Sequence, residues 1–163
     1  MQQRLWAPWR EGYITKINHN QHKGCVFCTI LKDNNDARNF IVLRSDLAYV
    51  VLNIYPYSNG HCLVCPKRHV ADLSKLTSEE LKEMMQLVIK TKELLQKTLS
   101  PHGFNMGMNL GRIAGAGMPK HIHFHVVPRW KGDHNFMPVV SQTKVISQSL
   151  KAIYRLLIDA NKK

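Results

Sequence analysis

Residues 121–127 read His-Ile-His-Phe-His-Val-Val, an alternation of histidine with apolar residues over the first six positions. Because successive side chains of a strand point to opposite faces, this alternation predicts an extended strand whose three histidines share one face. The apolar residues between them then face a core. Imidazole is the side chain whose charge changes near neutral pH, so the row of histidines predicts a chemically active face.

Two other interpretations of the row stay open at this point. A histidine in a strand is often a polar residue satisfied by its neighbours, but three on one face, just after the glycine-rich segment 111–117, disfavour that explanation. Alternatively, His121 and His123 could chelate a catalytic zinc ion, since His-x-His on a strand binds zinc in hydrolytic enzymes. Such a site needs a further ligand and an open coordination position.

The alternation resembles the His-φ-His-φ-His-φ-φ signature, φ being apolar, of the histidine triad (HIT) family of nucleotide hydrolases and transferases. Asn53 and the segment 60–66, which contains His61, look like the nucleotide-side strand of that family. Asn109 precedes the glycine-rich loop, where the family has a polar amide. The resemblance covers about residues 25–130.

Two flanking segments narrow the resemblance to one branch of the family. Residues 4–10 read Arg-Leu-Trp-Ala-Pro-Trp-Arg, and residues 128–138 read Pro-Arg-Trp-Lys-Gly-Asp-His-Asn-Phe-Met-Pro. Both are similar to the branch that contains diadenosine-tetraphosphate phosphorylases and related hydrolases. The implied activity is transfer of a nucleotidyl group from the α-phosphate of an adenine nucleotide or dinucleoside polyphosphate.

The resemblance implies a covalent nucleotidyl-histidine intermediate with His123 as the nucleophile. His125 would contact phosphoryl oxygens and assist the leaving group. Asn53 would meet the ribose hydroxyls, Asn109 the phosphate oxygens, and His61 would lie behind the residues that touch substrate. No catalytic cofactor is required by this scheme.

The acceptor of the nucleotidyl group is left open by the sequence. Water would make the protein a hydrolase, inorganic phosphate would make it a phosphorylase of diadenosine tetraphosphate, and a nucleoside phosphoramidase is a further alternative. A nucleic-acid-binding module is an alternative of a different class. The scattered lysines, without a basic and aromatic stripe, make binding to nucleic acid the weaker expectation.

The loop before the triad departs from the family pattern. Many members have Ala-Gly-Gln-Ser/Thr there, whereas residues 114–120 of this chain read Ala-Gly-Ala-Gly-Met-Pro-Lys. Backbone N–H groups of a glycine-rich loop can still hold phosphate oxygens, so Gly115 and Gly117 are expected to line the phosphate site. Lys120 could add positive charge to it.

Four cysteines form two Cys-x-x-Cys pairs, of which the second belongs to a predicted strand. Cys62 and Cys65 are three residues apart, so on a strand their side chains face opposite sides and cannot bind one ion together. We expect both to be small buried residues of the core. The spacing of the two pairs also exceeds that of usual zinc ribbons.

The first pair lies outside any regular strand pattern and can form a zinc knuckle. In zinc-bearing HIT proteins such a pair joins two histidines, one after a Pro-Lys-x-His segment and one that opens the triad. Those positions are His69 and His121 here. The resemblance therefore implies a structural zinc site made of Cys25, Cys28, His69 and His121.

Hydrophobic periodicity and turn residues predict an α+β fold in one domain over residues 1–163, and the resemblance implies a HIT-like fold. An irregular segment 1–37 precedes a core over about 38–130, which holds an antiparallel sheet of about five strands. A long helix is expected from the Thr77–Glu80 capping box to Ser100. Leu81, Met84 and Met85 are expected on its core face. The predicted strands are 40–43, 47–52, 61–66, 104–110 and 120–127, and a C-terminal helix is predicted at about 143–160.

Composition fits a small globular protein of 163 residues that are 44% hydrophobic. No apolar run approaches 18 residues and no secretory signal is visible, so we expect a cytoplasmic protein without membrane contact. The net charge of +12 fits either a solvated lysine-rich surface or attraction of polyanionic nucleotides. Members of the HIT family usually form homodimers, which the resemblance implies here.

Overall fold

The computed structural model describes residues 24–133, 140 and 145–162. A five-stranded antiparallel sheet lies at its centre in the order β1-β2-β3-β5-β4, which confirms the predicted α+β class. Strand β4 forms one edge. The strands are β1 (Ile41–Arg44), β2 (Ala48–Leu52), β3 (Cys62–Pro66), β4 (Gly103–Gly107) and β5 (Phe124–Arg129).

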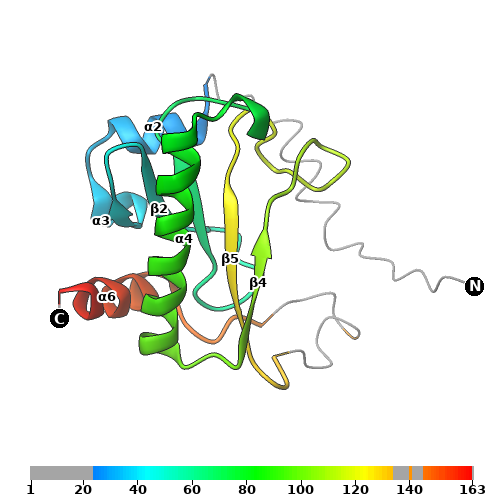
Figure 1. The fold of residues 1–163 in the computed structure, drawn as a ribbon. Helices are drawn as coiled ribbons and strands as arrows, with labels where there is room; N and C mark the ends of the chain where they lie inside the picture. The colour runs from blue at the N-terminus through cyan, green and yellow to red at the C-terminus, as the bar shows by residue number, and fades with distance from the viewer. Residues whose placement is uncertain (1–23, 134–139, 141–144, 163) are drawn as a thin grey trace, which may run out of the picture.

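Helices cover the sheet on two sides (Figure 1). The long helix α4 (Ser78–Leu99) lies along one face, and α6 (Leu150–Asn161) packs beside it and against β1. The short helix α2 (Val26–Lys32) packs against the other face, followed by α3 (Asp36–Asn39). A 3-10 turn, η2 (Leu73–Lys75), precedes α4. In the part of the chain that the structure describes, no helix is long and apolar enough to cross a membrane.

The residues on the two faces of the sheet belong to two separate apolar clusters. Val50 and Val64 pack with α4 and α6, whereas Tyr49 packs with α2. Cys62 joins the first cluster and Cys65 the second, as their spacing on the strand predicts. Burial raises the pKa of the Cys62 thiol to about 12 and that of Cys65 further, so both are neutral core residues.

The predicted capping box starts α4. The hydroxyl of Thr77 accepts a hydrogen bond from the backbone N–H of Glu80 at 3.2 Å, and the Glu80 carboxylate accepts one from the N–H of Thr77 at 2.9 Å. The same carboxylate binds the guanidinium of Arg68 at 2.6 and 2.8 Å. Beside that guanidinium, the pKa of Glu80 is lowered, which keeps the buried carboxylate ionised. The helix ends at Leu99, and its C-cap Ser100 has a left-handed conformation immediately before Pro101.

The expected core face of α4 was wrong for two residues. Met84 is 3% exposed, but its neighbour Met85 is 47% exposed and Leu81 is 41% exposed. Consecutive helical residues point about 100° apart, so Met84 and Met85 cannot both face the sheet. Leu81, Met85 and Ile89 instead form an exposed apolar stripe at spacing i, i+4, i+8.

One unpredicted helix and three shifted element boundaries differ from the prediction. The segment 1–37 was expected to be irregular, yet the described part contains α2, whose Phe27, Ile30 and Leu31 repeat with helical spacing. The C-terminal helix begins at Leu150 and not near 143, because Ser149 caps it through the N–H of Ala152. Strand β4 ends at Gly107 and β5 begins at Phe124, so both are shorter than predicted at the end near the triad.

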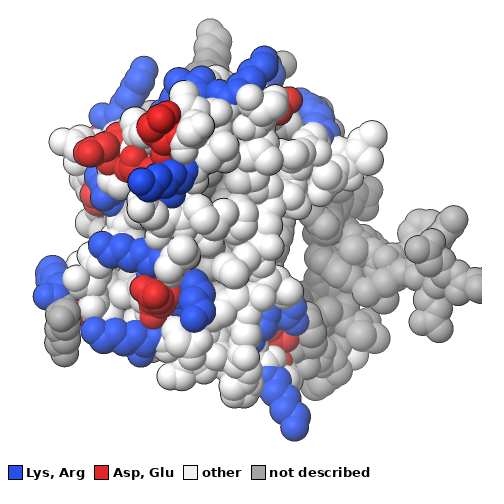
Figure 2. All heavy atoms as spheres, in the orientation of Figure 1, with Lys and Arg blue, Asp and Glu red and all other residues white. Residues whose placement is uncertain are grey.

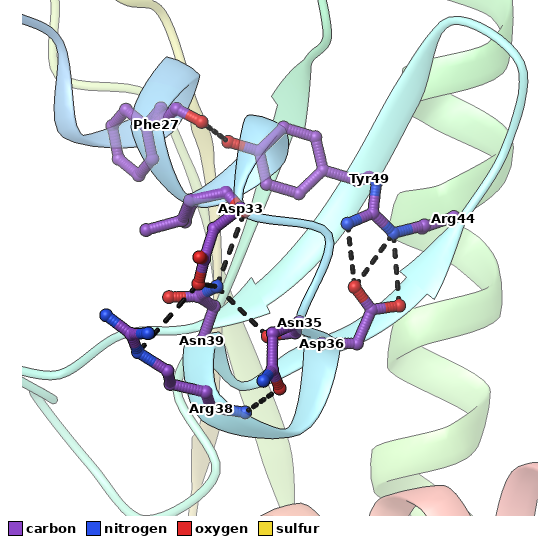
Figure 3. Close-up of polar contacts among 9 residues, drawn as sticks. Phe27, Asp33, Asn35, Asp36, Arg38, Asn39, Arg44 and Tyr49 are labelled. Carbon is purple, nitrogen blue, oxygen red and sulfur yellow. Dashed lines mark hydrogen bonds and ion pairs between the residues drawn. The ribbon is translucent and has the colours of Figure 1, made fainter.

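Helix α2 is attached to the sheet by hydrogen bonds as well as by packing (Figure 3). The buried hydroxyl of Tyr49 donates to the carbonyl oxygen of Phe27 at 2.9 Å. The Asn39 amide donates to Asp33 at 2.7 Å, which closes the turn between α2 and α3, and Arg44 forms a two-pronged ion pair with Asp36. The Tyr49 hydrogen bond fixes the start of α2 over the sheet, and the other contacts fix the turn after α2 and helix α3.

The hydrogen bond from Tyr49 to Phe27 can be tested by mutation. Tyr49→Phe should lower the free energy of unfolding by about 1–3 kcal/mol, because the buried carbonyl of Phe27 loses its donor. Urea unfolding followed by circular dichroism measures this. The control is Tyr154→Phe, a half-buried tyrosine whose hydroxyl has no hydrogen bond in the described residues, and it should change stability by less than about 0.5 kcal/mol. Equal losses in the two variants would contradict the anchoring role.

Candidate active site and metal site

The three triad histidines lie on one side of the chain around the start of β5, as the alternation predicts. Their exposed fractions are 0% for His121, 7% for His123 and 8% for His125. Ile122 and Val126 point the other way, into the cluster beneath α4. Although β5 proper begins at Phe124, the N–H of Ile122 donates to the carbonyl of Val70 at 2.7 Å and keeps the preceding residues aligned with the sheet.

The central histidine has a defined tautomer. Nδ1 of His123 lies 2.9 Å from the carbonyl oxygen of His121, and since a carbonyl only accepts, this nitrogen carries the proton. The lone pair is therefore on Nε2. Burial lowers the pKa of His123, so the ring is neutral at pH 7. A neutral imidazole with an available Nε2 is chemically a nucleophile.

The third histidine is the end of a chain of hydrogen bonds. The backbone N–H of Tyr57 donates to Nδ1 of His61 at 3.0 Å, so the proton of neutral His61 is on Nε2. That nitrogen lies 2.9 Å from Nδ1 of His125 and donates to it. The proton of His125 is consequently on its Nε2, on the opposite edge of the ring.

Nε2 of His125 is buried and has no hydrogen-bond partner among the residues that the structure describes. Burial first, and the nearby His123 second, lower the pKa of His125 to about 4. The ring is therefore a neutral hydrogen-bond donor at pH 7. A buried donor without a partner is costly, so this N–H marks a place for a ligand atom that accepts.

Two aromatic rings that the sequence did not single out enclose the histidines. Phe27 of α2 contacts His121 and His123, with ring centroids 5.3 and 5.0 Å apart. Tyr57 stacks on His125 at 5.6 Å with nearly parallel rings and also contacts His61 at 4.7 Å. Both rings restrict the histidines through space. Phe27 shares the helical spacing of Ile30 and Leu31, whereas Tyr57 lies in a turn and has no periodic signal.

The two predicted asparagines occupy different places. Asn53 accepts the backbone N–H of Tyr55 at 2.9 Å, and its Nδ2 lies 3.3 Å from Nδ1 of His61. Asn53 is thus joined to the chain of hydrogen bonds that ends at His125. Asn109 is half-buried and lines a groove of about 230 Å³ beside His125. The groove is formed by Tyr57, Asn105, Met106, Gly107, Met108, Asn109, His125 and Val127.

The glycine-rich loop makes hydrogen bonds within itself. The N–H of Gly115 donates to the carbonyl of Arg112 at 3.0 Å, and the N–H of Ala116 donates to Gly111 at 3.2 Å. Gly115 has a φ of +91°, a left-handed conformation that favours glycine. Gly117 follows and is half-buried, whereas Lys120 is exposed. The structure thus gives Gly115 a role in the shape of the loop.

The predicted metal ligands come together. One ligand atom from each of Cys25, Cys28, His69 and His121 lies within 4.8 Å of the others. Sγ of Cys25 is 3.3 Å from Nδ1 of His121, and Sγ of Cys28 is 3.6 Å from the same nitrogen and 3.4 Å from Nδ1 of His69. Cys25 caps α2 and Cys28 lies in its first turn, so the expected knuckle is the start of a helix.

These separations fit tetrahedral zinc. With Zn–S bonds of about 2.3 Å and Zn–N bonds of about 2.0 Å, ligand atoms of a tetrahedron lie roughly 3.3–3.8 Å apart. Nε2 of His121 donates to the carbonyl of Pro66 at 2.9 Å, which leaves Nδ1 free to ligate. Among the described residues, the group of possible ligands includes His121 but not His123. The geometry therefore favours a closed structural site over a catalytic metal on the triad.

Comparisons with known proteins agree with this arrangement. The sequence matches the HIT domain over residues 34–132. The AP-4-A phosphorylase of Mycobacterium tuberculosis is 40% identical in an alignment of 161 residues that covers 95% of this chain and 82% of that protein. The adenosine 5'-monophosphoramidase of Schizosaccharomyces pombe is 35% identical over 105 residues, which are 64% of this chain and 74% of that protein.

The fold is shared with solved structures. A zinc-bound histidine triad family protein from Mycobacterium smegmatis superposes with a TM-score of 0.68 at 29% identity, over 85% of this chain and 93% of that protein. A histidine triad nucleotide-binding protein from Candida albicans superposes with a TM-score of 0.59 at 30% identity, over 66% of this chain and 76% of that protein. Together with the sequence match over residues 34–132, this shows that the chain belongs to the HIT family.

Proposed function

We propose that this protein transfers or hydrolyses nucleotidyl groups at the α-phosphate of adenine nucleotides, with diadenosine polyphosphates as substrates. The observation that carries the proposal is the pair of fixed tautomers, in which His123 offers a lone pair and His125 offers an unpartnered N–H. The activities named for the phosphorylase and phosphoramidase relatives support the same chemistry. We take the whole chain, residues 1–163, as a single HIT domain.

The reaction has two displacements. Nε2 of His123 attacks the α-phosphorus, a P–N bond forms, and the P–O bond to the leaving phosphate breaks with its electron pair on the leaving oxygen. The N–H of His125 stabilises that oxygen. Water or inorganic phosphate then attacks the nucleotidyl-histidine, and the P–N bond breaks to return the lone pair to His123.

The remaining site residues bind substrate in this proposal. Asn53 meets the ribose hydroxyls while it also holds His61, and Asn109 meets phosphate oxygens beside His125. Gly117 brings backbone close to the phosphates, and Gly115 shapes the turn that presents it. His61 acts by holding the tautomer of His125.

His123→Ala is expected to remove essentially all turnover, a loss on the order of 5 kcal/mol of transition-state stabilisation. The assay is incubation with diadenosine tetraphosphate, with and without inorganic phosphate, followed by chromatography. ADP plus ATP identifies phosphate as the acceptor, and AMP plus ATP identifies water. His102→Ala is the control, since this exposed histidine lies outside the site. A His123→Ala variant that keeps a tenth of wild-type activity would exclude the covalent mechanism.

We also propose a structural zinc ion on Cys25, Cys28, His69 and His121. Its support is the match between the ligand separations and tetrahedral coordination, and the zinc-bound relative. Zinc bound there would hold the start of α2 against the chain that carries the nucleophile. A closed site with four protein ligands has no position for substrate, so no catalytic step passes through it.

Purified protein should therefore carry about one zinc per chain, measured by elemental mass spectrometry. Cys28→Ser should lower both the zinc content and the melting temperature, because one of four ligands is lost. Cys62→Ala serves as the control, since this buried cysteine lies in the other cluster and its loss should leave the zinc content unchanged. Unchanged zinc content and melting temperature in Cys28→Ser would rule out the site.

We propose that the protein is a homodimer. The support is the exposed apolar stripe of Leu81, Met85 and Ile89 on α4, together with Met106 on the edge strand β4, which is 51% exposed. Figure 2 shows uncharged surface over the middle and right of this view, whereas most of the visible basic and acidic side chains lie along its top and to its left, where α4 and α6 lie in Figure 1.

Light scattering should give a mass of twice 18.8 kDa for the wild type. Ile89→Glu should shift the protein towards the monomer, because it places a charge in the apolar stripe. Lys97→Glu, a charge change on an exposed lysine of the same helix, is the control and should leave the mass unchanged. A monomeric wild-type protein would refute the proposal.

A further inference from the structure

One flat side chain covers the hydrogen bond that joins two buried histidines. The Tyr57 ring contacts the His61 ring at 4.7 Å and stacks on the His125 ring at 5.6 Å, nearly parallel to it. The two imidazoles lie 5.1 Å apart and are joined by the hydrogen bond from Nε2 of His61 to Nδ1 of His125. The two histidines are buried, whereas Tyr57 is 41% exposed. Tyr57 therefore has one side against the histidine pair and the rest of its surface towards solvent.

The position of the proton on His125 depends on the exclusion of water. A neutral imidazole has two tautomers, and its hydrogen-bond partners select one of them. The backbone N–H of Tyr57 selects the tautomer of His61, and His61 in turn selects that of His125. Water both donates and accepts, so a water molecule that replaced His61 at Nδ1 of His125 would satisfy either tautomer. The N–H on Nε2 of His125 would then be present for only part of the time.

The turn that carries Tyr57 is held against α4 and the segment before α6. Gly60 has a φ of +73°, and a Cβ placed on it would lie 2.6 Å from the Leu99 side chain, so only glycine lets the turn approach α4 this closely. The Asn59 amide donates to the side-chain oxygen of Gln148 at 2.7 Å, which ties the turn to the residues just before α6. The ring and the backbone N–H of Tyr57 therefore have a fixed position relative to the histidine pair.

The nucleophile is restrained by a different aromatic ring. In the part of the chain that the structure describes, the ring contacts of Phe27 are with His121 and His123, whereas those of Tyr57 are with the other pair. The tautomer of His123 is selected by the carbonyl oxygen of His121, a hydrogen bond in which Tyr57 has no part. Loss of the Tyr57 ring should therefore leave the tautomer of His123 unchanged.

We propose that Tyr57 is a positioning residue for His125, because its ring keeps water from the hydrogen bond between His61 and His125 and so keeps the proton of His125 on Nε2. The inference rests on the proposed function for its catalytic consequence. It goes beyond that function because it assigns a residue that acts through His125. The backbone N–H of Tyr57 holds His61 from the other side, so one turn residue acts on both members of the pair.

The proton positions can be measured directly by proton–nitrogen correlation NMR on the isotope-labelled full chain at pH 7. The signals of His125 are identified by their absence from His125→Asn. In the wild type, His61 and His125 should each show one tautomer, with the proton on Nε2. In Tyr57→Ala, His125 should show nitrogen shifts averaged between its two tautomers. His61 should keep its tautomer, because the backbone N–H at position 57 remains, and His123 should keep its own.

Three further variants separate the ring of Tyr57 from its bulk and from a general loosening of the site. Tyr57→Phe keeps the ring and should keep the wild-type pattern. Tyr57→Leu keeps apolar bulk but is too narrow to cover both imidazoles, so it should average the tautomers of His125 as alanine does. Phe27→Leu, which removes the ring from the other pair, is the matched control and should leave His125 unchanged. A single tautomer of His125 in both Tyr57→Ala and Tyr57→Leu, or averaging that also reaches His123, would overturn the inference.

The catalytic consequence is measured with adenosine 5'-phosphoramidate. Tyr57→Ala should lower kcat by about tenfold, which is less than the roughly 10²–10³-fold cost of removing such a donor outright. KM should stay within about twofold, because a positioning residue makes no contact with the bound substrate, and Tyr57→Phe should restore kcat. An unchanged kcat, or a loss that falls on KM instead, would overturn the positioning role. A wild-type protein inactive on both this substrate and diadenosine tetraphosphate would overturn the proposed function, whereas the NMR result for His125 decides separately whether Tyr57 holds its tautomer.

Discussion

One hydrogen bond connects the candidate active site with the candidate metal site: the Nδ1–H of His123 donates to the carbonyl oxygen of His121. The backbone of His121 thereby sets the tautomer of His123, the proposed nucleophile, while the side chain of His121 faces the thiols of Cys25 and Cys28. The arrangement of the proposed metal ligands and the availability of the Nε2 lone pair of His123 therefore depend on the position of a single residue. Phe27, in contact with both rings, fills the space between them.

Burial gives this site its electrostatic character. The three triad histidines have lowered pKa values because their charged forms would lose hydration, and each is therefore neutral at pH 7. Each neutral ring then has one nitrogen with a proton and one without. A carbonyl oxygen decides which for His121 and His123, and the Nε2–H of His61 decides it for His125. The proposed chemistry requires a lone pair on His123 and an N–H donor on His125. A ring that was mobile or protonated would not keep these two roles separate.

The sequence predicted the strand-based features well, because alternation on a strand is strict. The common face of His121, His123 and His125, and the opposite faces of Cys62 and Cys65, follow from that period alone. The family resemblance, and not the strand period, predicted that Cys25 and Cys28 lie close to His69 and His121. The through-space contacts of Phe27 and Tyr57 were not predictable, because they depend on how a short helix and a turn fold back onto the sheet. Met85 was misplaced because apolar character alone does not distinguish a buried helix face from an exposed one.

Glu80 has a double attachment that links distant parts of the fold. Its carboxylate closes the cap of α4 through Thr77 and also holds Arg68, the residue before His69. The start of the longest helix and the segment that carries a predicted metal ligand thus share one buried anion. Local opening of the first turn of α4 would release Arg68 in the same event. Amides of that turn and of residues 68–70 would then exchange with solvent as one cooperative unit, although they belong to different elements.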